Sequence, residues 1–180
     1  MKRIELTDAF LTAPVAATYG TAKRYLDDGW YILTVDEVTT PTVVNGVERQ
    51  RIIFKEENTG LTVPYFHTSG AENDSDLWKV KNSVPVVAAI VQAAGVQWTG
   101  VERANCQAPS ALVGRKIYAL LTTKETKKTT VDPVTMQNVE RVFINNDFSK
   151  EGRLCDVIKP VAASQTTTAV ESDFNFSFNA

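Results

Sequence analysis

Short runs of alternating apolar and polar residues after Gly29 predict a chain built mainly from β-strands. The first run, residues 30–35, is dense in aromatic and β-branched side chains, which favour strands. The next run, residues 48–55, alternates strictly. It places Ile52 and Phe54 on one face and Arg49, Arg51, Ile53 and Lys55 on the other. A third strand is expected over residues 61–66.

Turn residues separate these strands. Asn45-Gly46 is a strong signal for a tight hairpin, because both residues tolerate a positive φ. Residues 56–60 form a second polar turn, and residues 69–76 are a polar loop. The loop ends at Asp76, a candidate N-cap for a helix that starts at Leu77.

The middle of the chain predicts helix. Pro85 is expected to break it into two pieces, since proline cannot donate the backbone hydrogen bond. Residues 86–94 are interpreted as a buried helix that Gly95 ends, with a strand as the alternative because of their β-branched content. Trp78 and Trp98 are assigned to the core or to helix packing, and residues 97–109 to a connecting loop.

Two further strands are expected at residues 115–124 and 139–146, joined by a long hairpin loop over residues 125–137. Three strands, a helix and two strands is the order of the OB-fold, a five-stranded Greek-key barrel. The sequence therefore predicts an N-terminal extension with a short helix at 1–28, an OB-fold domain at 29–158 and a flexible tail at 159–180.

Charge and composition narrow the function. The formal net charge is −2, yet basic residues outnumber acidic ones by eight to five between Arg115 and Arg153. Two distant cysteines and a single histidine are too few for a structural metal site, and no cofactor is expected. No nucleophile elbow, phosphate loop or zinc-hydrolase motif is present, so a non-enzymatic protein is expected. No apolar run approaches the ~18 residues of a membrane-spanning helix, and the N-terminus lacks the apolar block of a signal peptide, so the cytoplasm (the host cytoplasm if viral) is the expected location.

Basic and aromatic residues share strand faces in a way that suits single-stranded nucleic acid. Phosphates attract lysine and arginine, and unstacked bases lie flat against aromatic rings. The candidate residues for binding single-stranded DNA, or RNA, are Trp30, Tyr31, Arg49, Arg51, Lys55, Lys116, Tyr118, Lys124, Lys127, Lys128, Arg141 and Phe143. The alternative for each aromatic residue is a place in the core.

The C-terminal segment combines acids with aromatic residues. Glu171 and Asp173 precede a series of phenylalanines at alternate positions, Phe174, Phe176 and Phe178. Such a tail could compete with DNA for a basic cleft or dock into a partner protein, whereas an added edge strand would also fit the alternation. If it shields the cleft, removing residues 171–180 tightens DNA binding.

Taken together, these segments resemble the single-stranded DNA-binding proteins of tailed bacteriophages. The resemblance covers residues 29–158 and the tail. It rests on the strands at 30–35 and 49–66, on the segment 111–118 leading into a lysine-rich hairpin and 141–146, and on the acidic, phenylalanine-bearing end. It implies a protein that coats exposed strands during phage DNA replication, recombination and repair, and that contacts replication or recombination proteins through its tail.

A second hypothesis belongs to a different class. A phage structural or assembly protein could use the same β-barrel to pack against neighbouring subunits as a homo-oligomer. An enzyme is the third alternative, with no nucleophile or base to assign.

Overall fold

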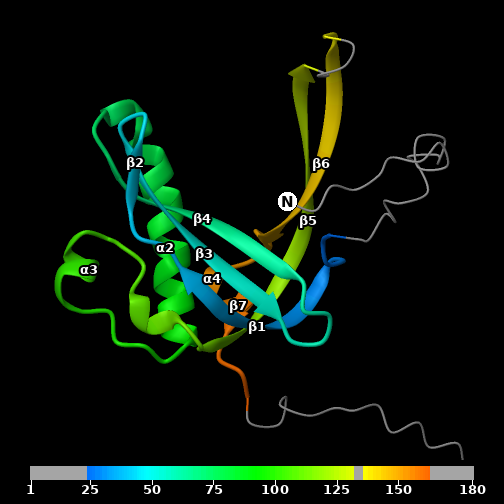
Figure 1. Cartoon of the computed structure of the whole chain (residues 1–180). Coiled ribbons are helices and arrows are strands. Elements are labelled where there is room, and N and C mark those ends of the chain that lie inside the picture. The colour runs from blue at the N-terminus through cyan, green and yellow to red at the C-terminus, as the bar shows by residue number, and fades with distance from the viewer. Residues whose placement is uncertain (1–23, 132–135, 163–180) are drawn as a thin grey trace, which may run out of the picture.

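A computed structural model describes residues 24–131 and 136–162 (Figure 1). The expected tail residues Glu171, Asp173, Phe174, Phe176 and Phe178, and most of the N-terminal extension, lie outside these ranges. Within the described ranges, no helix has both the length and the apolar character needed to cross a membrane.

The central strand is β1 (Gly29–Val38), which pairs antiparallel with β3 (Val47–Glu56) on one side and β5 (Lys116–Val131) on the other. The remaining strands join these two: β2 (Thr42–Val44) and β4 (Thr62–Ala71) pair with β3, and β6 (Asn138–Phe148) and β7 (Ile158–Lys159) pair with β5. The mainly β class is confirmed. The described strands number seven rather than five, in one antiparallel sheet that does not close.

The described part of the chain has five helical segments: η2 (Asp74–Asp76), α2 (Leu77–Ala93), α3 (Gly100–Ala104), η3 (Ser110–Leu112) and α4 (Leu154–Val157). The prediction that Pro85 divides the long helix is wrong, because α2 runs through it. Pro85 and Lys81, whose carbonyl would have accepted the missing hydrogen bond, are both exposed, so water can satisfy that carbonyl. The buried segment after Pro85 is helical and not a strand.

The prediction of a hairpin loop over residues 125–137 is also largely wrong. Strand β5 continues to Val131 and pairs residue by residue with β6 as far as Asn138, so the two strands form a long arm that projects from the sheet (Figure 1). Threonines recur along this segment of β5, and their β-branched side chains favour an extended chain.

Two local predictions are confirmed. Ile52 and Phe54 are buried, whereas Arg49, Arg51 and Lys55 on the opposite face of β3 are exposed. Asn45 and Gly46 both have positive φ angles, 51° and 71°, between the paired residues Val44 and Val47, as a tight hairpin requires.

The core lies between the sheet and α2. Leu33 from β1, Phe54 from β3 and Ile117 from β5 are fully buried, and Val87 and Ile90 of α2 pack into the same cluster. Removing this apolar surface from water is the main stabilising contribution to the fold.

Strands β4 and β6 face one another without a backbone ladder between them in the described part of the sheet. Aromatic side chains join them instead. Phe148 of β6 meets Phe54 edge-on, with ring centroids 5.6 Å apart, and meets Tyr65 of β4 at 5.5 Å. Edge-to-face packing of this kind contributes about 0.5–1.5 kcal/mol per pair beyond the buried area. We call this junction the seam.

A buried polar network fixes α2 and the loop before η3 against β4. The Nδ1 atom of His67 lies 2.8 Å from Ser83 Oγ, and its Nε2 atom lies 2.7 Å from the carbonyl oxygen of Cys106. Because that carbonyl can only accept, Nε2 carries the proton, and the neutral ring takes the Ser83 hydroxyl hydrogen at Nδ1. Burial lowers the pKa of His67 below its ordinary value, although Cys106 and the charge of Glu48 act against this shift.

We expect Phe148→Ala to lower the free energy of unfolding by about 3–5 kcal/mol, because it removes the ring that joins β6 to Phe54 and Tyr65. Urea denaturation measures this change. The matched control is Val142→Ala, an exposed position on the same strand, which should cost less than about 1 kcal/mol. Equal losses for the two variants would show that the seam has no special role.

The stability of the protein should fall as the pH is lowered from about 6.5, the ordinary pKa of histidine. Below that pH the unfolded chain binds a proton at His67 that the folded chain, with its lowered pKa, does not. Each unit by which folding lowers the pKa of His67 corresponds to about 1.4 kcal/mol of stability lost at a pH well below both pKa values. His67 is the single histidine of the chain.

Urea midpoints between pH 7.5 and pH 5 test this expectation. In His67→Gln the neutral amide keeps one acceptor and one donor, so the decline over this range should flatten. A decline as steep as that of the wild type would assign the effect to carboxylates instead.

Candidate functional site

The arm of β5 and β6 presents one regular face. Since side chains alternate along a strand, Lys124, Thr126 and Lys128 lie on the same face of β5. Their cross-strand partners on β6 are Asn145, Phe143 and Arg141, in that order. We call this set the arm face. Lys127 lies on the opposite face, where its ammonium group pairs with Glu140 at 3.1 Å.

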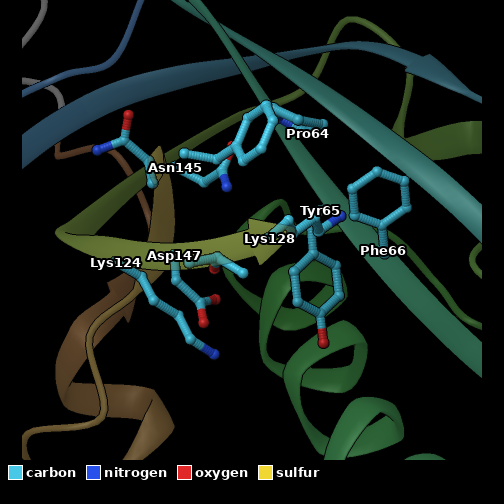
Figure 2. A pocket seen from close by; sticks show the side chains of 10 residues that line it. Pro64, Tyr65, Phe66, Lys124, Lys128, Asn145 and Asp147 are labelled. Atoms are coloured by element: carbon cyan, nitrogen blue, oxygen red, sulfur yellow. The ribbon is translucent and has the colours of Figure 1, made fainter. Parts of the chain in front are cut away.

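The arm face forms a groove together with the edge of β4. One cavity of about 440 Å³ is lined by Lys124, Lys128, Phe143 and Asn145 from the arm and by Pro64, Tyr65 and Phe66 from β4. Figure 2 shows Tyr65 and Phe66 on one side of this cavity, and Lys124, Asn145 and Asp147 on the other.

A second cavity of about 550 Å³ continues this hollow along α2. It shares Tyr65, Phe66 and Asp147 with the first cavity, so the two form one continuous depression across the seam. Trp78 and Lys79 of α2 line it on one side, and Lys150 lines it on the other. We call the two cavities together the seam groove.

Three aromatic side chains of the seam groove are largely open to solvent. The exposed fractions are 68% for Phe66, 59% for Trp78 and 41% for Phe143. Lysines accompany two of the rings: Lys128 Nζ lies 5.8 Å from the centroid of Phe143, and Lys79 Nζ lies 5.8 Å from that of Trp78. Exposed rings beside cations suit a flat, anionic ligand better than they suit a core.

The floor of the seam groove is more polar. The hydroxyl of Tyr65 lies 3.3 Å from Ser83 Oγ. Burial raises the pKa of Tyr65, and the nearby charge of Asp147 adds to this, while the contact with Ser83 opposes it. Tyr65 is therefore a neutral hydrogen-bonding group at physiological pH and not a base.

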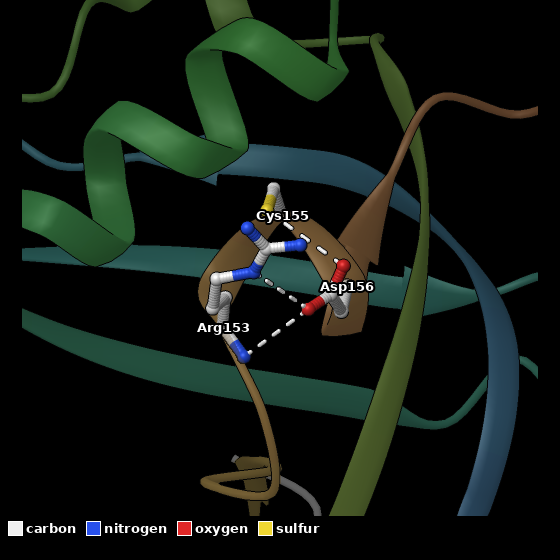
Figure 3. Close-up of polar contacts among 3 residues, drawn as sticks. All are labelled: Arg153, Cys155 and Asp156. Atoms are coloured by element: carbon white, nitrogen blue, oxygen red, sulfur yellow. Dashed lines mark hydrogen bonds and ion pairs between the residues drawn. The ribbon is translucent and has the colours of Figure 1, made fainter.

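The corner after β6 closes one end of the second cavity, where Gly152 and Leu154 line it. In this corner the guanidinium Nε of Arg153 donates to Asp156 Oδ2 at 3.2 Å, as Figure 3 shows. The hydrogen bond from Arg153 is the main reason that the pKa of Asp156 lies below its ordinary value. Arg153 therefore stabilises the turn after β6 through its pair with Asp156.

A separate surface lies where β1, β5 and β7 meet. Trp30 and Tyr118 stack with centroids 4.7 Å apart and an interplanar angle of 24°, and Lys159 Nζ lies 4.7 Å from the Trp30 ring. We call these three residues the β1–β5 patch. Tyr118, Lys124 and Lys128 occupy even-numbered positions of one unbroken register along β5, so the patch and the arm face belong to the same face of that strand.

The structure does not gather all of the predicted residues. Tyr31 turns towards the core and donates its hydroxyl hydrogen to the carbonyl of Asp27 at 2.9 Å. Lys116 forms an ion pair with Glu57. Arg49, Arg51 and Lys55 lie on the outer face of β3, and Arg51 is directly opposite Phe66 of β4, which connects that face to the seam groove.

Sequence reasoning missed several residues of the groove. The assignment of Trp78 to the core is wrong, whereas Trp98 does pack against the core and donates its Nε1 hydrogen to Gln107. Phe66 carried a signal that was not used: it falls on the polar side of an alternating strand, out of phase with buried Val63 and His67. For Lys79 and Asp147 no sequence signal exists, because their neighbourhood arises from distant segments.

No protein-family model matches the chain, and comparison with curated proteins also gives no match. Residues 24–131 and 136–162 contain no cluster of three or more side chains able to hold a metal ion. The geometry of the seam groove is therefore the basis on which a function can be assigned.

Proposed function

We propose that this protein binds single-stranded DNA without sequence specificity and holds the strand in the seam groove. The observation that carries the proposal is the alternation of exposed rings and lysines across the seam, from Phe143 and Lys128 through Phe66 to Trp78 and Lys79. Bases can stack on the rings while the phosphates lie near the ammonium groups.

Exposed rings favour a single strand over a duplex. In a duplex the faces of the bases are stacked on one another, so they offer no surface to Phe66 or Phe143. The seam groove is also open along its length from the arm to α2, as a path for a continuous polymer requires.

The order of the elements supports an OB-type architecture as part of this proposal. Strands β1, β3 and β4 precede α2, strands β5 and β6 follow it, and β1 pairs with both β3 and β5. OB-folds are often incompletely closed, and they bind oligonucleotides on the face of their second and third strands between two loops. Here that face is the outer surface of β3 and β4, with Arg51 beside Phe66, and the β5–β6 arm takes the place of the second loop.

Within the phage hypothesis, the protein would coat exposed strands during replication, recombination and repair. The β1–β5 patch would provide a second stacking position through Trp30 and Tyr118, and Arg49 and Lys55 would add phosphate contacts on the outer face of β3. The C-terminal tail would regulate binding or recruit partners.

The direct test is a titration of intrinsic fluorescence with a poly-dT strand of ~30 nucleotides, about twice the largest site of one OB-fold, and with its duplex equivalent. We expect strong quenching by the single strand, a much smaller response to the duplex, and weakening by salt. No response at low salt would exclude the proposal and favour the assembly protein instead, whose mark would be a stable, salt-insensitive oligomer seen by light scattering.

Variants of the seam groove and of the arm face locate the site. Phe66→Ala and Phe143→Ala should each weaken binding by about 1–3 kcal/mol, the contribution of one base stack. Lys128→Ala should reduce the slope of log affinity against log salt by ~0.7, the contribution of one phosphate contact. Arg141→Glu, next to Lys128 on the arm face, should also weaken binding.

Lys127→Ala is the matched control, because Lys127 is adjacent in sequence but lies on the opposite face with Glu140. Its salt slope should equal that of the wild type. Similar effects of Lys127→Ala and Lys128→Ala would show that the arm face is not the binding face.

A further inference from the structure

Asp147 stands out in the seam groove because of its charge. It lines both cavities of the groove and a third hollow of about 280 Å³ beside them, together with Lys124 and Lys150. Among the described residues, it is the one acid that lines the two cavities of the seam groove. A carboxylate at this position repels phosphates, so its presence needs a different explanation from that of the lysines.

The local hydrogen bonds leave half of this carboxylate available. Asp147 Oδ1 accepts the backbone N–H of Phe148 at 2.9 Å, which fixes the orientation of the group. Its Oδ2 atom accepts no hydrogen bond from the described residues, and none of the ion pairs found among them joins Asp147 to Lys124 or Lys150. Figure 2 shows Asp147 and Lys124 extending from the arm on the same side.

We infer that Asp147 contacts the edges of the bases and gives the groove, which recognises no defined sequence, a preference for bases with an exocyclic amino group. This inference rests on the proposed function, since it concerns the same bound strand. Phe66 and Phe143 line a cavity with Asp147, so a base stacked on either ring lies near the carboxylate. Cytosine offers its N4 amino hydrogens to a carboxylate. Thymine offers a single N–H, flanked by two carbonyl oxygens that the carboxylate repels.

The probes are (dC) and (dT) homopolymers of about 15 nucleotides, near the upper end of the site size of an OB-fold. Dissociation constants are measured at pH 7.5 and low salt for the wild type and for Asp147→Asn. The asparagine carbonyl keeps the hydrogen bond from Phe148 N–H and turns amino hydrogens towards the groove, where the carboxylate acceptor had been.

We expect Asp147→Asn to lower the ratio of the (dT) to the (dC) dissociation constant by roughly three- to tenfold, the effect of one hydrogen bond. Glu151→Gln is the matched control. Glu151 is exposed, lines the third hollow with Asp147, and does not line the seam groove, so removing its charge should leave the ratio unchanged.

A second probe has a wild-type arm that needs no variant. Replacing cytosine by 2-pyrimidinone, which is cytosine without its amino group, should weaken binding to the wild type by a similar factor; no weakening would overturn the amino-group preference even if Asp147→Asn folds poorly. Where Asp147→Asn folds, the same replacement should leave its binding nearly unchanged.

The inference is overturned if Asp147→Asn shifts both affinities by the same factor, or if Glu151→Gln changes the ratio as much. In either case Asp147 affects binding through its negative charge and not through contacts with the bases, and the proposal that the groove binds DNA is unaffected. If the wild type binds neither strand at low salt, the proposed function fails and the inference fails with it.

Discussion

The seam between β4 and β6 is the constraint on which the rest of the molecule depends. A closed barrel would satisfy both strand edges with backbone hydrogen bonds, whereas here the rings of Phe54, Tyr65 and Phe148 hold the edges near each other. Ring packing holds β4 and β6 near each other without using their backbone hydrogen-bonding groups and without filling the seam groove. The same contact therefore stabilises the core below and leaves the groove open above.

Strand β5 connects the core to the surface. Its first residues pair with β1 and bury Ile117, Ala119 and Leu121, and its later residues pair with β6 alone. Because the register is unbroken, the strand face opposite the core carries Tyr118 near the base of β5 and Lys124 and Lys128 on the arm. A shift of one residue would exchange Lys128 for Lys127, so burial at the base of the strand determines which lysines face the groove.

Sequence patterns predicted the parts of this fold that depend on neighbouring residues. The alternation in β3 and the Asn45-Gly46 turn follow from local geometry, as does the helix after Pro85. The length of the arm was missed, because exposed threonines and lysines also suit a loop and only pairing with β6 decides between them. The groove could not be predicted as a whole, since α2, β4 and β6 are distant in sequence.

A net charge of −2 does not by itself argue against an anionic ligand, because the charges are distributed unevenly. Lys127 is paired with Glu140, Lys116 with Glu57 and Arg153 with Asp156, all away from the arm face. Within the seam groove, Lys79 is paired with Asp76. Lys124 and Lys128 have no acidic ion-pair partner among the described residues, so their charge remains available to the groove. Over a Debye length of about 8–10 Å, a ligand responds to these local charges far more than to the total. The groove can therefore attract phosphate while the whole chain is acidic, and a single carboxylate within it can act on the bases without abolishing that attraction.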